Sequence, residues 1–388
     1  MKRGNGEGTI TKTKINGIDY WMAEYTLGYV DGKRKYKRLY GKTRKEVKEK
    51  LDKLIIEIGT DTYIEKQKIT LYSICNNLIE YEYKMNLLND SSYLRKLDTL
   101  KQIDKHYIAR KNLQDVNGYD VKDFLVYITK YSKSTITKLY GVTNKGFKKA
   151  VKDNVIKKNF LDDKFEYGIP NSKKQTKKIR AFTLDEQKQF LNVLKENDIK
   201  KIPYKYQFLL GMFTGMRMGE INALTLQNID LKNNMIYVKA TLTKSVLEGI
   251  TKGEKTKTYA GMRDIIIDEQ VKSILNDYIN NYYVENKEKL LFYDFKNNTY
   301  ITTNEINCSF KRLCKKYNIA NNVNQHMLRH TFATRCIESN MPAHVLQKRL
   351  GHKSINITLD TYCDMFSQYQ TEHINNTLDY LNKNGLNL

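Results

Sequence analysis

The chain has 388 residues, 40% of them hydrophobic, and carries a formal net charge of +24 at pH 7. This hydrophobic content suffices for buried cores and excludes wholesale disorder. Apolar runs such as FLLGMF fall far short of the roughly 18–20 residues of a membrane span, and the N-terminus MKRGNGEGTI lacks the apolar stretch of a signal peptide. We therefore expect a cytoplasmic protein with no membrane partner. Because the positive charge is clustered, it predicts a polyanionic partner, with nucleic acid ahead of an anionic membrane.

Cysteine and metal-ligand spacing narrow the chemistry further. The five cysteines lack Cys-x-x-Cys spacing, which argues against a zinc ribbon or a disulfide framework and fits a reducing compartment. The sequence also contains neither a Walker A loop nor a His-Glu-x-x-His pattern. We therefore expect no metal and no cofactor.

In chain order, residues 1–62 are expected to form a first unit, a three-stranded β-sheet with one helix. The strand-like runs TITKTK, DYWMAEYTLGYV and KRKYKRLYG are separated by Asn16-Gly17 and Asp31-Gly32, which suit type I′ hairpin turns. A helix should follow from Thr43, where Thr-Arg-Lys-Glu has capping-box spacing and precedes an apolar stripe that ends at Gly59.

The third of these strands is basic at five of the six positions from 33 to 38. Such a run can be a solvated face or a protected sheet edge. In a chain of this charge, we favour a strand laid into a groove of nucleic acid. Its candidate DNA-binding residues are Lys33, Arg34, Lys35, Lys37 and Arg38.

Residues 66–168 have helical, aromatic-rich periodicity and are expected to form a helical bundle. Within it, Thr143 is a candidate N-cap for a helix that carries lysines on its exposed side. A basic linker is expected over 169–182, where an extended chain can follow phosphate backbones. The candidate DNA-binding residues of this linker are Lys173, Lys174, Lys177 and Lys178.

Residues 183–388 are expected to form a mostly helical unit with a small antiparallel sheet. TLDE at Thr183 supplies a capping box, and the runs MIYVKATLTK and MRDIIID have the composition of strands. The chain thus has the pattern of a multidomain α+β protein.

Arg217 falls just after a break, Thr214-Gly215, that separates two apolar helical stretches. Glu220 lies one helical turn further on. A partly buried guanidinium needs a partner. The two residues therefore form a purely structural ion pair, or Glu220 holds Arg217 so that its guanidinium is aimed at an external oxyanion.

His326, Arg329 and His330 stand at positions i, i+3 and i+4 of HMLRHTF, so they share one face of a helix. A zinc site is disfavoured there, because a cationic arginine would lie beside a dication and no third ligand is evident. A histidine–arginine pair directed at a phosphate fits the net charge better.

Three more candidates lie in the same unit. Lys257 precedes a turn at Gly261, so it is expected at the end of a hairpin, where a lysine is usually only solvated. Downstream, VLQKRLGH ends a helix at Gly351 and presents His352 just past the cap. Tyr362 follows ten residues later.

The stretches TGMRMGEINAL, KTKTYAGMR, HMLRHTFAT and LGHKSINITLDTY occur in the order found in the tyrosine recombinases, the phage lambda integrase family, which this chain resembles over roughly 180–388. The first two units also look like the arm-type and core-binding DNA-binding domains of integrases. The likeness is greatest to integrases of conjugative transposons and temperate phages. It implies an arm-type DNA-binding domain over 1–62, a core-binding domain over 66–168, and a catalytic domain with a tail helix over 183–388.

The resemblance implies a role for each candidate. Arg217 and Arg329 would hold the non-bridging oxygens of the scissile phosphate. Tyr362 would attack the phosphorus and form a 3′-phosphotyrosyl link, with no nucleotide or metal required. His326 would accept the tyrosine proton.

The remaining roles concern the leaving group and the phosphate. Lys257 would protonate the departing 5′ oxygen; Lys255 is the alternative, and Lys257 is chosen for its six-residue spacing to Arg263. His352 would hydrogen-bond the phosphate, and His330 is interpreted as structural support.

Beyond Tyr362 the chain departs from the family, since it reads Cys363-Asp364 where many relatives have a histidine. No role is assigned there. The rest of the tail has helical character with scattered apolar positions. It would pack on its own domain or, as the family suggests, dock on a neighbouring protomer.

The function implied is that of a site-specific DNA recombinase, the integrase and excision enzyme of a mobile element. Its partners would be double-stranded DNA at arm and attachment sites, further copies of the chain in a DNA-bound tetramer, and, as additional factors, a directionality factor and a host DNA-bending protein. A type IB topoisomerase and a non-catalytic DNA-binding protein are the alternatives.

Overall fold

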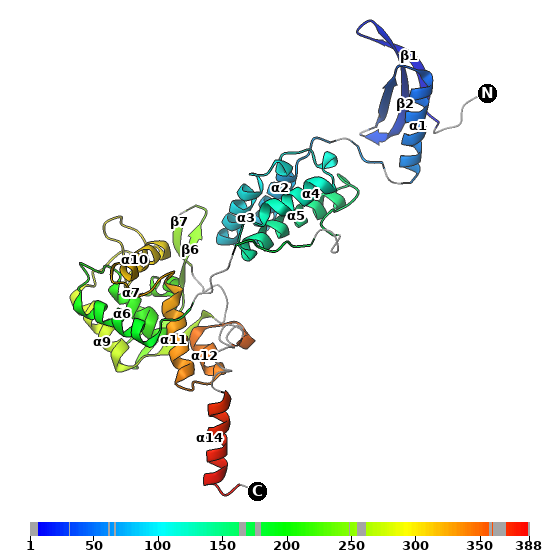
Figure 1. Ribbon diagram of the computed structural model, residues 1–388. Helices are drawn as coiled ribbons and strands as arrows, with labels where there is room; N and C mark the ends of the chain where they lie inside the picture. The colour runs from blue at the N-terminus through cyan, green and yellow to red at the C-terminus, as the bar shows by residue number, and fades with distance from the viewer. Residues whose placement is uncertain are drawn as a thin grey trace. The chain divides into compact units, whose positions relative to one another are not determined.

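The computed structural model describes residues 7–30, 32–60, 63–65, 67–162, 168–174, 180–247, 249–253, 261–356, 359 and 370–386. The chain divides into two compact units, 1–176 and 177–388, which are called the first and second units from here on (Figure 1). The first of these contains both the predicted β-sheet unit and the predicted helical bundle. Among the described residues, no helix has both the length and the apolar character needed to cross a membrane.

The first unit begins with an antiparallel sheet in the order β1-β2-β3, followed by a helix. The elements are β1 (Thr9–Ile15), β2 (Ile18–Val30), β3 (Lys33–Gly41) and α1 (Arg44–Gly59). The β1–β2 turn has positive φ at Asn16 (50°) and Gly17 (81°), as a type I′ turn requires. Val47 and Leu51 of α1 pack on Ala23 of the sheet. The predicted sheet and helix are confirmed.

The start of α1 differs in one detail from the predicted capping box. The Thr43 side chain accepts the N–H of Glu46 (3.1 Å) as expected, but the Glu46 carboxylate accepts the N–H of Lys42 (2.9 Å) instead of that of Thr43. The cap therefore reaches one residue further back along the chain.

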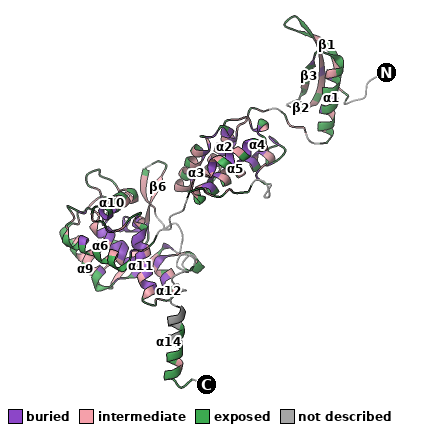
Figure 2. Ribbon diagram, in the orientation of Figure 1, coloured by how far each residue is buried: buried purple, intermediate pink, exposed green. Residues whose placement is uncertain are grey.

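The helical part of the first unit confirms the predicted bundle. Its helices are α2 (Leu71–Lys84), α3 (Asp90–Ile103), α4 (Gly118–Ile128) and α5 (Lys133–Lys152), and their apolar faces form one buried cluster (Figure 2). The prediction that Thr143 caps a helix is wrong. Thr143 is fully buried within α5, whose N-cap is Ser132, because the apolar spacing of Ile136 and Leu139 continues past it.

The second unit combines helices with two small antiparallel sheets, of order β4-β5-β8 and β6-β7. The elements are α6 (Leu184–Glu196), α7 (Lys205–Thr214), α8 (Met218–Ile221), β4 (Ile229–Asp230), β5 (Met235–Val238), β6 (Thr241–Ser245), β7 (Gly249–Gly253), β8 (Arg263–Ile266), α9 (Glu269–Asn281), α10 (Thr303–Lys316), α11 (His326–Glu338), α12 (Ala343–Leu350) and α14 (Gln370–Lys383). The multidomain α+β prediction is confirmed, as are the Thr183 capping box and a helix in the tail.

The strands of the second unit were only partly foreseen. The run MIYVKATLTK is divided between β5 and β6, which belong to different sheets. The strand β7, with sequence GITKG, was missed, because its terminal glycines and lysine are not typical of a strand.

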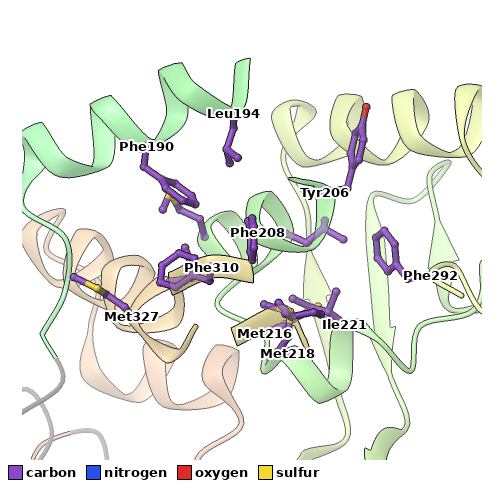
Figure 3. Close-up of a cluster of buried hydrophobic side chains, with 14 of the residues drawn as sticks. Phe190, Leu194, Tyr206, Phe208, Met216, Met218, Ile221, Phe292, Phe310 and Met327 are labelled. Carbon is purple, nitrogen blue, oxygen red and sulfur yellow. The ribbon is translucent and has the colours of Figure 1, made fainter. Parts of the chain in front are cut away.

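An aromatic core holds the second unit together (Figure 3). The rings of Phe190, Phe208 and Phe310 lie 5.5–6.1 Å apart between centroids. Met216 and Met218, which flank Arg217 in the sequence, are 1% and 4% exposed. Burying both neighbours directs the arginine between them away from the core.

Helices α2 and α5 approach closely at Gly146. A Cβ atom at this position would overlap the Sγ of Cys75 and lie 3.1 Å from a methyl group of Leu71. Gly141 lies one and a half turns earlier on α5, and a Cβ there would meet nothing within 4 Å. The helix thus carries one glycine required by packing and one that is not.

We expect Gly146→Ala to destabilise the helical part by about 1–3 kcal/mol, because overpacking outweighs the better helix propensity of alanine. The matched control Gly141→Ala should stabilise it by about 0.5–1 kcal/mol. Amide hydrogen exchange in α2 and α5 measures both changes. Equal effects of the two substitutions would contradict the close contact.

Candidate active site

Arg217 is positioned by a glycine turn and a short helix. Gly215 ends α7 with φ of 68°, and a Cβ there would collide with the ring of Phe332, so only glycine fits. Arg217 then forms the N-cap of α8, and both its backbone N–H and its Nη1 donate to Glu220 at 2.9 Å. Its side chain remains 40% exposed. The ion pair is therefore present, and the partial exposure of the side chain leaves the oxyanion-binding role of Arg217 as a prediction.

Glu220 is buried between two arginines. Its other contact is with Nη2 of Arg263, at 2.8 Å, and the Arg263 side chain is only 6% exposed. Burial alone would raise the pKa of Glu220, but Arg263 and Arg217 outweigh it and the pKa is lowered. The carboxylate is therefore charged at neutral pH and orients both guanidinium groups.

Arg329 lies between the C-terminal ends of two helices. Its Nη1 donates to the carbonyl of Gly215 (2.7 Å) after α7, and its Nη2 to that of Leu350 (2.6 Å) at the end of α12. The residue is only 8% exposed. Helix C-termini carry partial negative charge and so stabilise a buried cation.

Three histidines surround these arginines. His326 and His330 lie in the first turns of α11, and His352 follows the left-handed cap residue Gly351 of α12. Desolvation, together with Arg329, Arg217 and Arg263, lowers the pKa of His352 to about 4. The pKa of His326 is lowered by desolvation and by the charges of Arg329 and Arg217.

His330 completes the group. Desolvation, His326 and Arg329 lower the pKa of this residue as well. All three imidazoles are therefore neutral at pH 7.

The net charge of the cluster suits an anion. Arg217 and Arg263 pair with the single carboxylate of Glu220, whereas Arg329 is held by backbone carbonyls. Taken by themselves, these four side chains carry an excess of two positive charges beside neutral imidazoles. No group of three His, Cys, Asp or Glu side chains in the described part of the chain has a metal-binding arrangement.

Several predicted site residues lie outside the described residues: Lys255, Lys257, Tyr362, Lys177 and Lys178. The segments that lead to them are described, since β7 ends at Gly253, β8 begins at Arg263 and the chain is followed to Asn356 beyond α12. The structure therefore brings together Arg217, His326, Arg329 and His352, and leaves the lysine and the tyrosine as predictions.

Alternation along β3 divides the predicted basic strand between the two faces of the sheet. Arg34 and Arg38 lie with Tyr36 and Tyr40 on the face opposite α1. The other three basic residues share the face of Leu39, which packs towards α1: Lys33, Lys35 and Lys37. In the linker, Lys173 and Lys174 are exposed.

The sequence did not foresee two features of the site. One is the set of contacts made by Arg263, which had served only as a spacing marker. The other is an open hollow of about 370 Å³ beside His326, lined mainly by amide side chains. Its lining residues are Thr303, Asn304, Asn307, Asn324, Gln325 and His326. In the sequence, this hollow was signalled by the asparagine-rich runs TTNEIN and NNVNQ.

Comparison with known proteins identifies relatives. The model of the phage integrase family matches residues 180–368. The XerC-like tyrosine recombinase of Caldanaerobacter subterraneus subsp. tengcongensis is 25% identical over 92% of this chain and 96% of its own length. The transposase of transposon Tn916 from Enterococcus faecalis is 25% identical over 81% of this chain and 79% of its own length.

A solved structure supports the fold. The integrase of transposon Tn1549, in complex with transposon right end DNA, superposes with a TM-score of 0.65 at 21% identity. The match covers 79% of this chain and 99% of that one.

Removing the Glu220 charge should destabilise the second unit. Glu220→Gln leaves two guanidinium groups without their carboxylate, and breaking a buried pair in this way costs about 3–5 kcal/mol. The matched control is Glu186→Gln, because Glu186 pairs with the half-exposed Arg180 at 2.5 Å. Glutamine still completes that capping box, so a loss below about 1 kcal/mol is expected. Urea unfolding measures both; equal losses would contradict the buried role of Glu220.

Lowering the pH should also destabilise this unit. The three histidines have lowered pKa values when folded and an ordinary value of about 6.5 when unfolded, so unfolding takes up protons. Their contribution is complete above pH ~6.5 and is lost as the pH falls through their lowered pKa values, that of His352 being about 4. His352→Gln should lose less stability than wild type between pH 7.5 and 5, as followed by hydrogen exchange in α11 and α12. The control His344→Gln, at an exposed position of α12, should follow wild type.

Proposed function

Because the chain belongs to the phage integrase family of tyrosine recombinases, we propose that it cuts and rejoins DNA at specific sites through Tyr362. It is an enzyme of the kind encoded by mobile elements, as its relatives in transposons indicate. The observation that carries the proposal is the cluster of Arg217, Arg329, His326 and His352, whose charge and donors suit a phosphodiester.

Charge development in the reaction matches the cluster. A phosphodiester carries one negative charge, and the pentacoordinate transition state carries two. Arg217 and Arg329 bring permanently charged, planar donors to the non-bridging oxygens. The excess of two positive charges beside Glu220 balances the transition state better than the ground state, which is the condition for catalysis.

In the proposed cleavage step, the phenolic oxygen of Tyr362 attacks phosphorus as the bond to the 5′ oxygen breaks. The tyrosine proton passes to the neutral ring of His326, and Lys257, or alternatively Lys255, gives a proton to the departing 5′ oxygen. His352 hydrogen-bonds the phosphate. The product is a 3′-phosphotyrosyl link that retains the energy of the phosphodiester, so that a 5′-hydroxyl can reverse the step without nucleotide hydrolysis or metal.

The proposed DNA contacts involve both units. Arg34 and Arg38, beside Tyr36 and Tyr40 on the open face of the sheet, would bind arm sites together with the other basic residues of β3. Lys173 and Lys174, with the linker lysines that follow, would run along the phosphate backbone of the crossover site.

From the same family membership, we also propose how copies of the chain assemble and where they act. Recombination requires two DNA sites, which a tetramer on DNA would hold, with α14 as a tail that contacts its own or a neighbouring protomer. Ile374, Leu378 and Tyr380 of α14 are exposed and available for such a contact. A directionality factor and a host DNA-bending protein would be additional partners, and the action would take place in the cytoplasm, where the DNA substrate lies.

Tyr362→Phe should abolish covalent adduct formation, because phenylalanine lacks the attacking oxygen. A nicked suicide duplex carrying the crossover site, incubated in EDTA and run on a denaturing gel, should give a slow-migrating adduct with wild type only. Tyr237→Phe, on β5, is the matched control and should behave as wild type. An adduct formed by Tyr362→Phe would contradict the proposal, and plasmid relaxation without joining of partner sites would indicate a topoisomerase.

The general acid can be assigned with a leaving group that needs no proton. In a duplex with sulfur in place of the bridging 5′ oxygen, a thiolate leaves readily, because thiols have pKa values of about 8.5. Lys257→Met should cleave the ordinary duplex about 10²–10⁴-fold more slowly than wild type and the sulfur duplex at a similar rate. Lys255→Met is the matched control, and the opposite pattern would make Lys255 the general acid.

A further inference from the structure

Three arginines bind three consecutive carbonyl groups at the end of α12. Arg263 Nε donates to the carbonyl of Arg349 (2.7 Å), Arg329 Nη2 to that of Leu350 (2.6 Å), and Arg217 Nη2 to that of Gly351 (3.5 Å). The last carbonyls of a helix have no partner within it, and they carry the negative end of its dipole. The arginines therefore cap α12 with side chains from other elements.

Arg263 differs from the other two in how it is used. Each of its three guanidinium nitrogens donates to protein: Nε to α12, Nη1 to the carbonyl of Gly261 (3.2 Å) and Nη2 to Glu220 (2.8 Å). Its side chain is 6% exposed, against 40% for Arg217. A group so enclosed acts on its protein neighbours and not on a phosphate.

The three acceptors of Arg263 belong to different parts of the proposed machinery. Glu220 holds Arg217, which contacts the phosphate in the proposed mechanism. Gly261 follows the segment that contains the lysine candidates. Arg349 lies three residues before His352, on the stretch of chain that leads to Tyr362.

We propose that Arg263 is a positioning residue for strand cleavage, which fixes the end of α12, and with it His352 and the approach of Tyr362, relative to Arg217. This inference rests on the proposed recombinase function. Displacing a reacting group by about 1 Å can cost 10²-fold in rate. Loss of Arg263 therefore slows the chemical step more than it weakens DNA binding.

The test compares Arg263→Met and Arg263→Lys with Arg335→Met in the full-length protein. Arg335 is the matched control: it is an arginine of α11 that likewise binds three protein acceptors, Gln187 (2.8 Å), the carbonyl of Phe182 (2.7 Å) and Glu338. Rates of adduct formation are measured on the nicked suicide duplex at saturating DNA, below the unfolding temperature of every variant. Duplex affinity is measured separately.

We expect Arg263→Met to form adduct about 10²-fold more slowly than wild type, with its DNA dissociation constant changed less than about threefold. Lysine restores the hydrogen bond to α12 with one charge, so Arg263→Lys should recover at least about tenfold of that loss. Arg335→Met should unfold at a lower temperature and yet cleave at nearly the wild-type rate. Hydrogen exchange at residues 350–356 should rise in Arg263→Met and not in Arg335→Met.

Other outcomes would overturn the inference. Wild-type cleavage by Arg263→Met at saturating DNA would show that the α12 contact does not position the reaction. A loss of affinity equal to the loss of rate would make Arg263 a DNA-binding residue, and a similar slow rate in Arg335→Met would make the effect one of general stability. If wild type itself formed no adduct, the recombinase proposal would fail and this inference with it. If wild type formed adduct and Arg263→Met formed it at the same rate, only this inference would fail.

Discussion

The structure of the second unit depends on how the repulsion among its clustered guanidinium groups is offset. Three guanidinium groups are held together at the edge of an apolar core, where like charges repel strongly. One carboxylate, that of Glu220, offsets part of the repulsion, and the carbonyls at the ends of α7 and α12 offset a further part as fixed dipoles. The helices around the site therefore end where they do for electrostatic as well as steric reasons.

The aromatic core and the charged cluster are built from the same helices. In both α8 and α11, the polar residues of the cluster are interleaved in sequence with residues that belong to the aromatic core, such as Met218 and Leu328. Packing density in the core thus sets the direction of the guanidinium groups, since a buried neighbour leaves little rotational freedom. The geometry of the charged cluster is consequently a product of apolar packing.

Local sequence signals predicted the elements of the structure better than their contacts. Turn chemistry at Asn16-Gly17, the capping box at Thr183 and the break before Arg217 each specify local backbone geometry, and each was foreseen. Thr143 was misread because a threonine suits a cap and a tightly packed interior equally well in sequence. The bonds of Arg263 to Glu220 and Arg349 span 43 and 86 residues, and no local periodicity encodes pairings of that length.

The two unbalanced positive charges give the site a further property. A cluster whose carboxylate neutralises only one of three cations is incomplete as an electrostatic unit, and an anion is its missing component. Any phosphodiester that binds there relieves repulsion within the protein as well as making its own contacts, and a ligand that binds only the folded state stabilises that state. Affinity for such an anion and resistance to unfolding are therefore coupled in this unit.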